Sequence, residues 1–151
     1  MADKQPIVLL VDDEKNVLSS IQRALRLENV SVAVTLSPEE ALKYLSSQEV
    51  AVIVSDQKMP VMEGTELLAQ AHKIAPDTQR ILLTGHADVK IAINAINRGA
   101  VHRFLTKPWE DEVLRGVIRQ ALSSFQMIKE HQRLQRVTAE QNEQLQLLSR
   151  N

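Results

Sequence analysis

The sequence predicts an α/β fold, a doubly wound five-stranded parallel sheet of flavodoxin-like order 2-1-3-4-5 with a C-terminal helical extension. Short apolar runs of strand length alternate along the chain with amphipathic segments of helix length. Two of the runs, residues 7–11 and 50–54, are unbroken, which is typical of strands buried on both faces. We assign residues 1–125 to the α/β domain and residues 126–151 to the extension.

The first two strand and helix pairs are marked by acidic and capping residues. The first unbroken run leads directly into Asp12-Asp13-Glu14. Apolar residues then recur on one face of a helix from about Lys15 to Glu28, and residues 30–35 form the second strand. Ser37 is the expected N-cap of the next helix, with a proline at the first helical position and Glu40 placed to complete a capping box.

The central strand is the second unbroken run, which continues into Ser55 and Asp56. A loop containing Pro60 and Gly64 follows it. The loop leads to a third helix that ends near Ala75-Pro76, because proline disfavours helical backbone at the residue before it.

Turn and capping residues also mark the last elements. The fourth strand ends at Thr84, and the fourth helix is expected to start with Asp88 as its cap and to end at Gly99. A short fifth strand precedes Lys107-Pro108, and the last helix begins near Glu110.

This topology brings strand-end residues together. In a sheet of order 2-1-3-4-5 the winding reverses between the first and third strands, and ligands bind in the crevice at the carboxyl ends of those strands. Asp12, Asp13 and Asp56 are therefore expected to meet in that crevice. The fourth and fifth strands bring Thr84 and Lys107 to the same edge of the sheet.

These residue types indicate phosphoryl chemistry at a divalent cation. Three clustered carboxylates raise some of their pKa values unless a cation lies among them. Mg²⁺ suits such a cluster, because it takes oxygen ligands and keeps several waters, which leaves room for a phosphoryl oxygen. An aspartate is itself a nucleophile that can form an acyl phosphate. A metal, a lysine and a hydroxyl around Asp56 form a sufficient set to position and neutralise a phosphoryl group.

Residues 7–125 resemble the receiver domain of two-component response regulators, and this range is about four fifths of the chain. Each matching motif is weak alone, but together they are highly specific. The positions that match in order and spacing are Asp12-Asp13, Asp56, Met59-Pro60, Gly64, Thr84 and Lys107-Pro108.

The resemblance implies that Asp56 accepts a phosphoryl group from a histidine kinase or a phosphotransfer protein in an Mg²⁺-dependent reaction. It implies that Asp12, Asp13, Asp56 and the backbone carbonyl of Lys58 hold the ion. The protein is then a phosphoacceptor signalling domain that catalyses only its own phosphorylation and dephosphorylation, and not an enzyme with a separate substrate.

The resemblance also implies a switch. Lys107 pairs with the phosphoryl group, Thr84 bonds it after transfer, and Phe104 is the aromatic residue that changes rotamer with Thr84. The output surface is then formed by the fourth helix, the fifth strand, the fifth helix and the C-terminal extension. The resemblance further favours a cis peptide bond at Lys107-Pro108.

Composition limits the other function classes. The 18 basic and 19 acidic side chains give a net charge of −1 without a basic patch in the linear sequence, which argues against direct nucleic-acid or membrane binding. The absence of cysteine excludes thiolate metal sites and nucleophiles. Because the sequence shows no signal peptide and no apolar run of about 18 residues, we expect a cytoplasmic protein.

Alternative functions are open to test. A haloacid-dehalogenase-like phosphatase also uses an aspartyl phosphate, but it requires a second acid two residues after the nucleophile, where this chain has Lys58. A flavodoxin-like nucleotide-binding module requires a glycine-rich phosphate loop, where this chain has residues 12–16. The third alternative is a phosphate-independent interaction or dimerisation module, which the presence of every expected site residue disfavours.

The extension lacks glycine and proline and is rich in helix formers, so we expect it to prolong the last helix as a coiled coil or signalling linker. Apolar and polar residues share the seven-residue seam almost equally, which is too weak for a strong coiled coil alone. One half of the seam consists of Met127, Leu134, Gln141 and Leu148. We expect a parallel homodimer through this segment.

Two segments also resemble receivers that precede a particular output domain. Residues 84–88 and 104–109 are similar to those of receivers that precede cyclic-di-nucleotide phosphodiesterase domains of the HD-GYP type. The resemblance therefore allows a downstream output domain as a further partner.

Overall fold

The computed structural model describes residues 4–149, apart from the side chains of residues 148 and 149. In this range five strands alternate with five α-helices, and one 3₁₀ turn, His86–Asp88, precedes the fourth helix. All strands belong to one parallel sheet of order β2-β1-β3-β4-β5, so the predicted fold class is confirmed. The strands are β1 Ile7–Val11, β2 Ser31–Thr35, β3 Val52–Asp56, β4 Gln79–Thr84 and β5 Arg103–Thr106.

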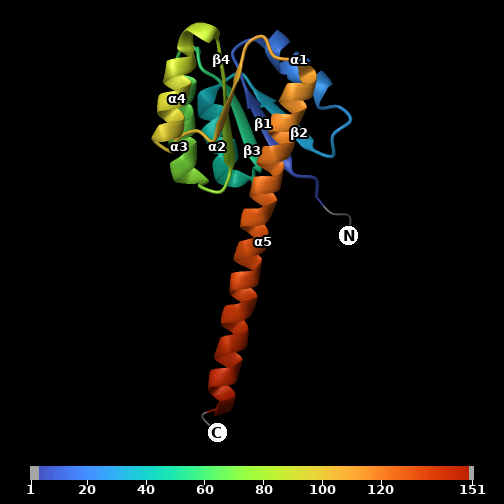
Figure 1. Ribbon diagram of the computed structural model, residues 1–151, viewed down its shortest axis with the longest axis vertical. Helices are drawn as coiled ribbons and strands as arrows, with labels where there is room; N and C mark the ends of the chain where they lie inside the picture. The colour runs from blue at the N-terminus through green and yellow to red at the C-terminus, as the bar shows by residue number, and fades with distance from the viewer. Residues whose placement is uncertain (1–3, 150–151) are drawn as a thin grey trace.

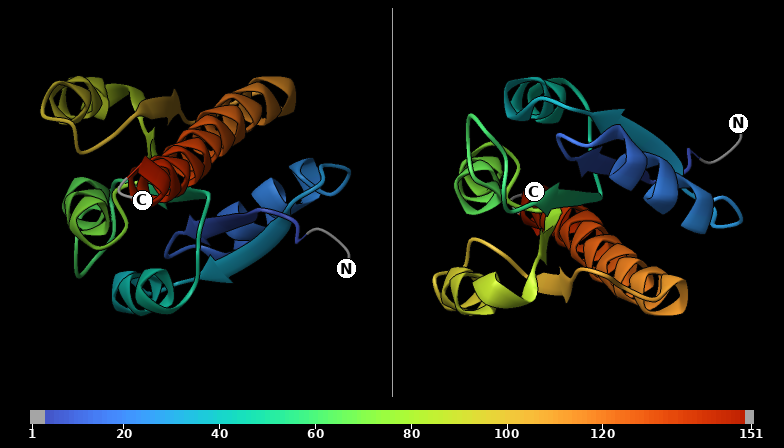
Figure 2. Two further views of the ribbon diagram at one scale, coloured as in Figure 1. Left: turned by 90° about the horizontal axis from the view of Figure 1, so that it is seen from below. Right: turned by 90° about the horizontal axis from the view of Figure 1, so that it is seen from above.

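Helices cover both faces of this sheet (Figures 1 and 2). Apolar side chains of α1 and α5 pack against one face, and those of α2, α3 and α4 pack against the other. The central strand β3 is buried along its whole length, as are the two residues before it, which explains the unbroken apolar run of residues 50–54. The helices are α1 Lys15–Ala24, α2 Pro38–Ser47, α3 Gly64–Ile74, α4 Val89–Asn97 and α5 Asp111–Ser149.

The start of α2 confirms the predicted cap but not the full capping box. The Ser37 hydroxyl oxygen accepts the backbone N–H of Glu40 at 3.2 Å. The Glu40 carboxylate does not return the bond to Ser37, because it accepts the hydroxyl of Thr35 at 3.0 Å. At the end of α4, Gly99 adopts a φ of 80°, as expected for a glycine that ends a helix.

One predicted helix boundary and one predicted cap are wrong. α1 ends at Ala24 and not near Glu28, because Leu25 turns into the core and the Arg115 guanidinium of α5 donates to the Ala24 carbonyl at 3.3 Å. Asp88 precedes α4 but makes no side-chain cap, since its carboxylate lies 3.6 Å from the ammonium of Lys58.

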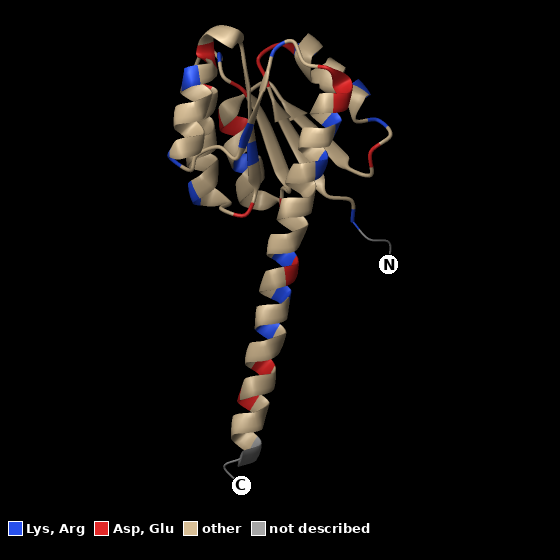
Figure 3. Cartoon of the chain, in the orientation of Figure 1, with Lys and Arg blue, Asp and Glu red and all other residues tan. Residues whose placement is uncertain are grey.

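The helix α5 runs along the sheet and continues past its N-terminal edge (Figure 1). Its 39 residues correspond to a length of about 58 Å. The projecting part contains both acidic and basic residues (Figure 3), and none of residues 126–147 is buried. The side chain of Leu148, part of the predicted seam, lies outside the described residues. No helix within residues 4–149 is long and apolar enough to cross a membrane.

Contacts between α5 and the domain do not stop at Phe125. The Lys129 ammonium lies 3.3 Å from the Glu49 carboxylate and 3.5 Å from that of Asp77. Gln132 donates to the Asp77 carboxylate at 2.9 Å. The first two turns of the predicted extension are therefore tied to the N-terminal edge of the sheet.

Candidate functional site

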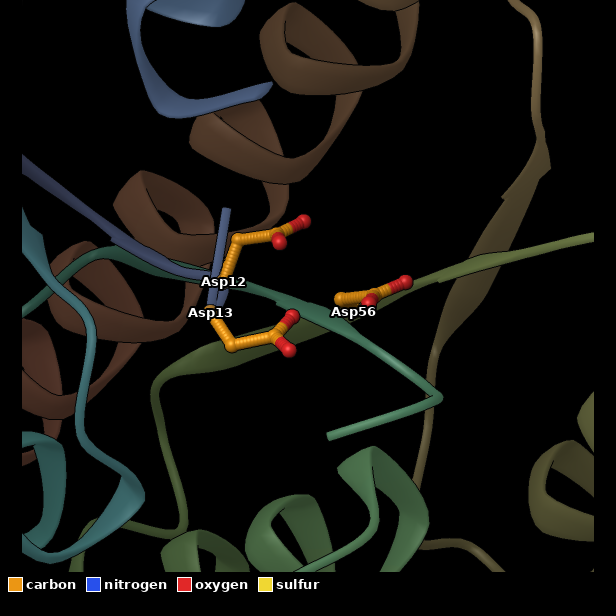
Figure 4. A group of neighbouring side chains, drawn as sticks. All are labelled: Asp12, Asp13 and Asp56. Carbon is orange, nitrogen blue, oxygen red and sulfur yellow. The ribbon is translucent and has the colours of Figure 1, made fainter. Parts of the chain in front are cut away.

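Asp56 is the last residue of β3, and it lies at the crevice between β1 and β3 with only 6% of its surface exposed. Asp12 and Asp13 follow β1, whose register pairs Val11 with Ser55 and so brings the acidic pair beside Asp56. One carboxylate oxygen from each of the three aspartates lies within 4.8 Å of the other two (Figure 4). The predicted convergence of remote carboxylates is thus present in the structure.

Lys107 lies among these carboxylates. Its ammonium is 2.8 Å from Asp56 Oδ1 and 3.5 Å from Asp12 Oδ2. Its backbone N–H donates to the carbonyl of Thr84 at 2.8 Å, which fixes the chain where it leaves β5. The peptide bond to Pro108 is cis, as expected.

The charges in the site are not balanced. Burial raises the pKa of Asp12 to about 6, and the charge of Asp56 adds to this effect, although the Glu14 N–H and Lys107 oppose it. Burial lowers the pKa of Lys107, but its bonds to Asp56 and Asp12 and their charges outweigh burial and hold that pKa above its ordinary value. One lysine therefore stabilises the aspartates only in part, and the site favours a further cation or a proton on Asp12.

The donor set fits Mg²⁺. Three carboxylates with one ammonium leave two negative charges, which a divalent cation would neutralise. Carboxylate oxygens are the hard ligands that Mg²⁺ prefers, and oxygens on opposite sides of one such ion lie roughly 4 Å apart. The separation among the three aspartates is compatible with that spacing.

The other predicted residues lie around this cluster. Thr84 is the buried end of β4, and its hydroxyl donates to the carbonyl of Gly85 at 3.3 Å. Phe104 on β5 is half-buried and packs against the core layer of α2, α3 and α4, so it is not part of the charged cluster. Lys58 lies in the loop between β3 and α3, and its ammonium lies near the carboxylate of Asp88.

Two features near Asp56 are evident only in the structure. The sequence predicts Gly64 as a turn residue, but a Cβ at this position would also collide with the carbonyl oxygen of Asp56 and lie 2.8 Å from Leu82 Cδ1. Gln57 belongs to no motif that the sequence displays, although it is 2% exposed and hydrogen-bonded to two residues at the start of α3. Its position directly after a strand-end acid is the only signal that the sequence offers.

Comparisons with known proteins agree with this geometry. A family model described as the response regulator receiver domain matches residues 8–119. The chain is 36% identical over 142 residues to the C4-dicarboxylate transport transcriptional regulatory protein DctD of Pseudomonas aeruginosa, covering 93% of this chain and 30% of that protein. It is 31% identical over 122 residues to the response regulator protein TodT of Pseudomonas putida, covering 81% of this chain and 53% of that protein. The chain thus spans about half or less of the length of these relatives.

A solved receiver domain is also similar to this chain. The signal receiver domain of an HD domain-containing protein from Pseudomonas fluorescens superposes with a TM-score of 0.79 and 37% identity. The match covers 86% of this chain and 96% of that one.

Proposed function

The chain belongs to the response regulator receiver domain family, and from this premise we propose that it is the phosphoacceptor of a two-component phosphorelay. In this proposal Asp56 takes a phosphoryl group from a histidine kinase or a phosphotransfer protein. The new charge then changes the surface formed by α4, β5 and α5.

The placement of Asp56 carries the proposal. Its carboxylate is held at the end of a buried strand, 2.8 Å from the Lys107 ammonium and beside Asp12 and Asp13. A nucleophile fixed in this way loses little further freedom when it attacks, and the cation beside it favours an incoming anionic group.

Transfer forms a P–O bond at Asp56 and breaks the P–N bond of the donor phosphohistidine, whose ring nitrogen keeps the electron pair and takes a proton. Lys107 is close enough to Asp56 to pair with an oxygen of the transferred group. Asp12, Asp13, Asp56 and the backbone carbonyl of Lys58 are the proposed ligands of Mg²⁺. When bound, this ion supplies positive charge to the phosphoryl oxygens.

The proposed response begins at Thr84. Its hydroxyl donates to Gly85 in the structure, and it would exchange this carbonyl for a phosphoryl oxygen. The space that the threonine leaves is then filled by Phe104, two positions before the end of β5. Such a two-position packing change biases the α4, β5 and α5 surface toward a partner.

We propose that α5 carries this change outward, to a second copy of the chain and to an output domain. Relatives include a protein named as a transcriptional regulator and another named as an HD domain-containing protein, so more than one kind of output occurs among similar receivers. Residues 126–151 are the proposed signalling extension, and residues 1–125 the proposed receiver unit.

A small phosphodonor tests the function without a kinase. Incubation with acetyl phosphate and Mg²⁺ should add one phosphoryl group to the intact mass, and a chelator should prevent it. Asp13→Ala should lose both Mg²⁺ binding and labelling while keeping its fold, whereas Asp111→Ala, an exposed acid of α5, should behave like wild type. A wild-type chain that never takes the phosphoryl group would favour the phosphate-independent interaction module.

A further inference from the structure

Gln57 has every polar group of its backbone and side chain bonded within the protein. Its backbone N–H donates to the carbonyl of Leu83 at 2.9 Å, and its backbone carbonyl accepts the N–H of Gly64 at 3.0 Å. Its side-chain oxygen accepts the N–H of Thr65 at 3.0 Å, and its side-chain nitrogen donates to the Glu63 carboxylate at 3.3 Å. Three of these bonds close the loop between β3 and α3 back onto its own first residue.

This arrangement replaces an ordinary helix cap. The first N–H groups of a helix lack partners inside the helix, and a side chain at the N-cap normally accepts one of them. The N-cap of α3 is Glu63, which makes no such bond. The Gln57 amide oxygen accepts the Thr65 N–H in its place, from a position eight residues earlier in the chain.

The location of Gln57 gives this cap a second consequence. The residue before it is Asp56, and the residue after it is Lys58, whose backbone carbonyl is a proposed ligand of Mg²⁺. Gly64 brings α3 so close to the Asp56 carbonyl that no side chain fits between them. The bonds of Gln57 therefore fix the backbone directly before residue 58 and join it to the start of α3.

We propose that Gln57 is a positioning residue that fixes the loop between β3 and α3 so that the Lys58 carbonyl faces the three aspartates. This inference rests on the proposed function, since it assigns a role toward Mg²⁺ at the same site. The side-chain bonds of Gln57 go to residues at the start of α3, so Gln57 is not itself a proposed ligand of the ion. It acts through the backbone of its neighbour, as partners that orient metal ligands do in other sites.

The test compares two buried glutamines. Gln57→Met keeps the size of the side chain and removes its hydrogen bonds, and Gln79→Met does the same at the opposite end of the sheet, where Gln79 is equally buried and accepts a bond from Arg103 at 3.3 Å. Titration of each protein with MgCl₂, followed by NMR, should show about tenfold weaker binding in the first variant only. In the metal-free protein, the Thr65 amide should exchange its hydrogen about tenfold faster in the first variant only.

Variants of Glu63 test the same idea if Gln57→Met does not fold. Glu63 is exposed, so the domain tolerates its replacement. Glu63→Gln removes the charge but keeps an acceptor oxygen for the Gln57 amide, whereas Glu63→Met removes both. The methionine variant should bind Mg²⁺ about threefold more weakly than the glutamine variant.

The outcomes separate the two proposals. Wild-type affinity in Gln57→Met, or equal affinities in the two Glu63 variants, overturns the role of Gln57 and leaves the phosphoacceptor function intact. A wild-type chain that binds no Mg²⁺ and takes no phosphoryl group overturns both. Weaker binding in Gln57→Met together with unchanged binding in Gln79→Met supports the assignment.

Discussion

Asp12 makes the stability of the metal-free protein depend on pH. Burial raises its pKa from 3.8 to about 6, so the folded protein holds this proton more tightly than the unfolded chain does. Between pH 3.8 and about pH 6 the folded state binds more protons than the unfolded chain does. The contribution of Asp12 to the free energy of unfolding therefore falls as pH rises through this range, by about 3 kcal/mol in total.

Asp12→Asn should remove this dependence. An asparagine keeps an acceptor for the Glu14 N–H, which Asp12 binds at 2.9 Å, but it does not ionise. In urea titrations with chelator, the variant should be more stable than wild type at neutral pH, and the difference should shrink toward about pH 4. A difference that is constant over this range would show that the Asp12 carboxyl does not titrate as described.

The residues of the site differ in how far the sequence reveals them. Asp12, Asp56 and Lys107 end strands, and parallel topology alone brings strand ends to one edge, so their meeting could be predicted. Gln57 could not be predicted, because it bonds residues six and eight positions away across an irregular loop. Side-chain bonds of this kind leave no periodic pattern in a sequence.

Thr84→Ala should separate phosphorylation from response. The variant keeps the aspartates and Lys107, so it should still take the phosphoryl group. It lacks the hydroxyl that we propose draws the end of β4 toward that group. Phosphorylation-induced NMR shifts at Phe104 and along α4 should become small, whereas Thr84→Ser, which keeps a hydroxyl, should retain them. Shifts as large as those of wild type in Thr84→Ala would place the coupling elsewhere in the domain.

Whole elements were easier to predict than their ends. Unbroken and amphipathic apolar patterns predicted all five strands and five helices of the described chain in the correct order. The end of α1 depends on Arg115, which lies far away in the sequence, and the carboxylate of Asp88 forms an ion pair with Lys58. Tertiary contacts therefore decided the end of α1 and the missing cap of α4, and local propensity did not.

At the scale of the whole molecule, the projecting helix predicts association. Exposed apolar side chains recur along its outer part, including Met127 at 72%, Leu134 at 50% and Leu145 at 63% exposure. Polar residues interrupt this seam, so we expect a weak parallel dimer that phosphorylation strengthens.

Sedimentation of three chains tests this expectation. The full chain should form dimers, and a chain ending at Phe125 should be monomeric. A chain ending at Gln135 keeps the Lys129 and Gln132 contacts with the domain but loses the outer half of the seam with Gln141, Leu145 and Leu148, so it should also be monomeric. If all three are monomers with and without acetyl phosphate and Mg²⁺, the extension does not form the dimer interface.

The most direct test of the central claim is to locate the phosphoryl group on the chain. An acyl phosphate is reduced by borohydride, which converts the modified aspartate to homoserine and so marks its position for peptide mass spectrometry. After treatment with acetyl phosphate and Mg²⁺, the mark should appear at Asp56 alone, and Asp56→Asn should take no phosphoryl group. A mark at another residue of wild type, or an intact-mass adduct that persists in Asp56→Asn, would contradict the claim that Asp56 is the phosphoacceptor.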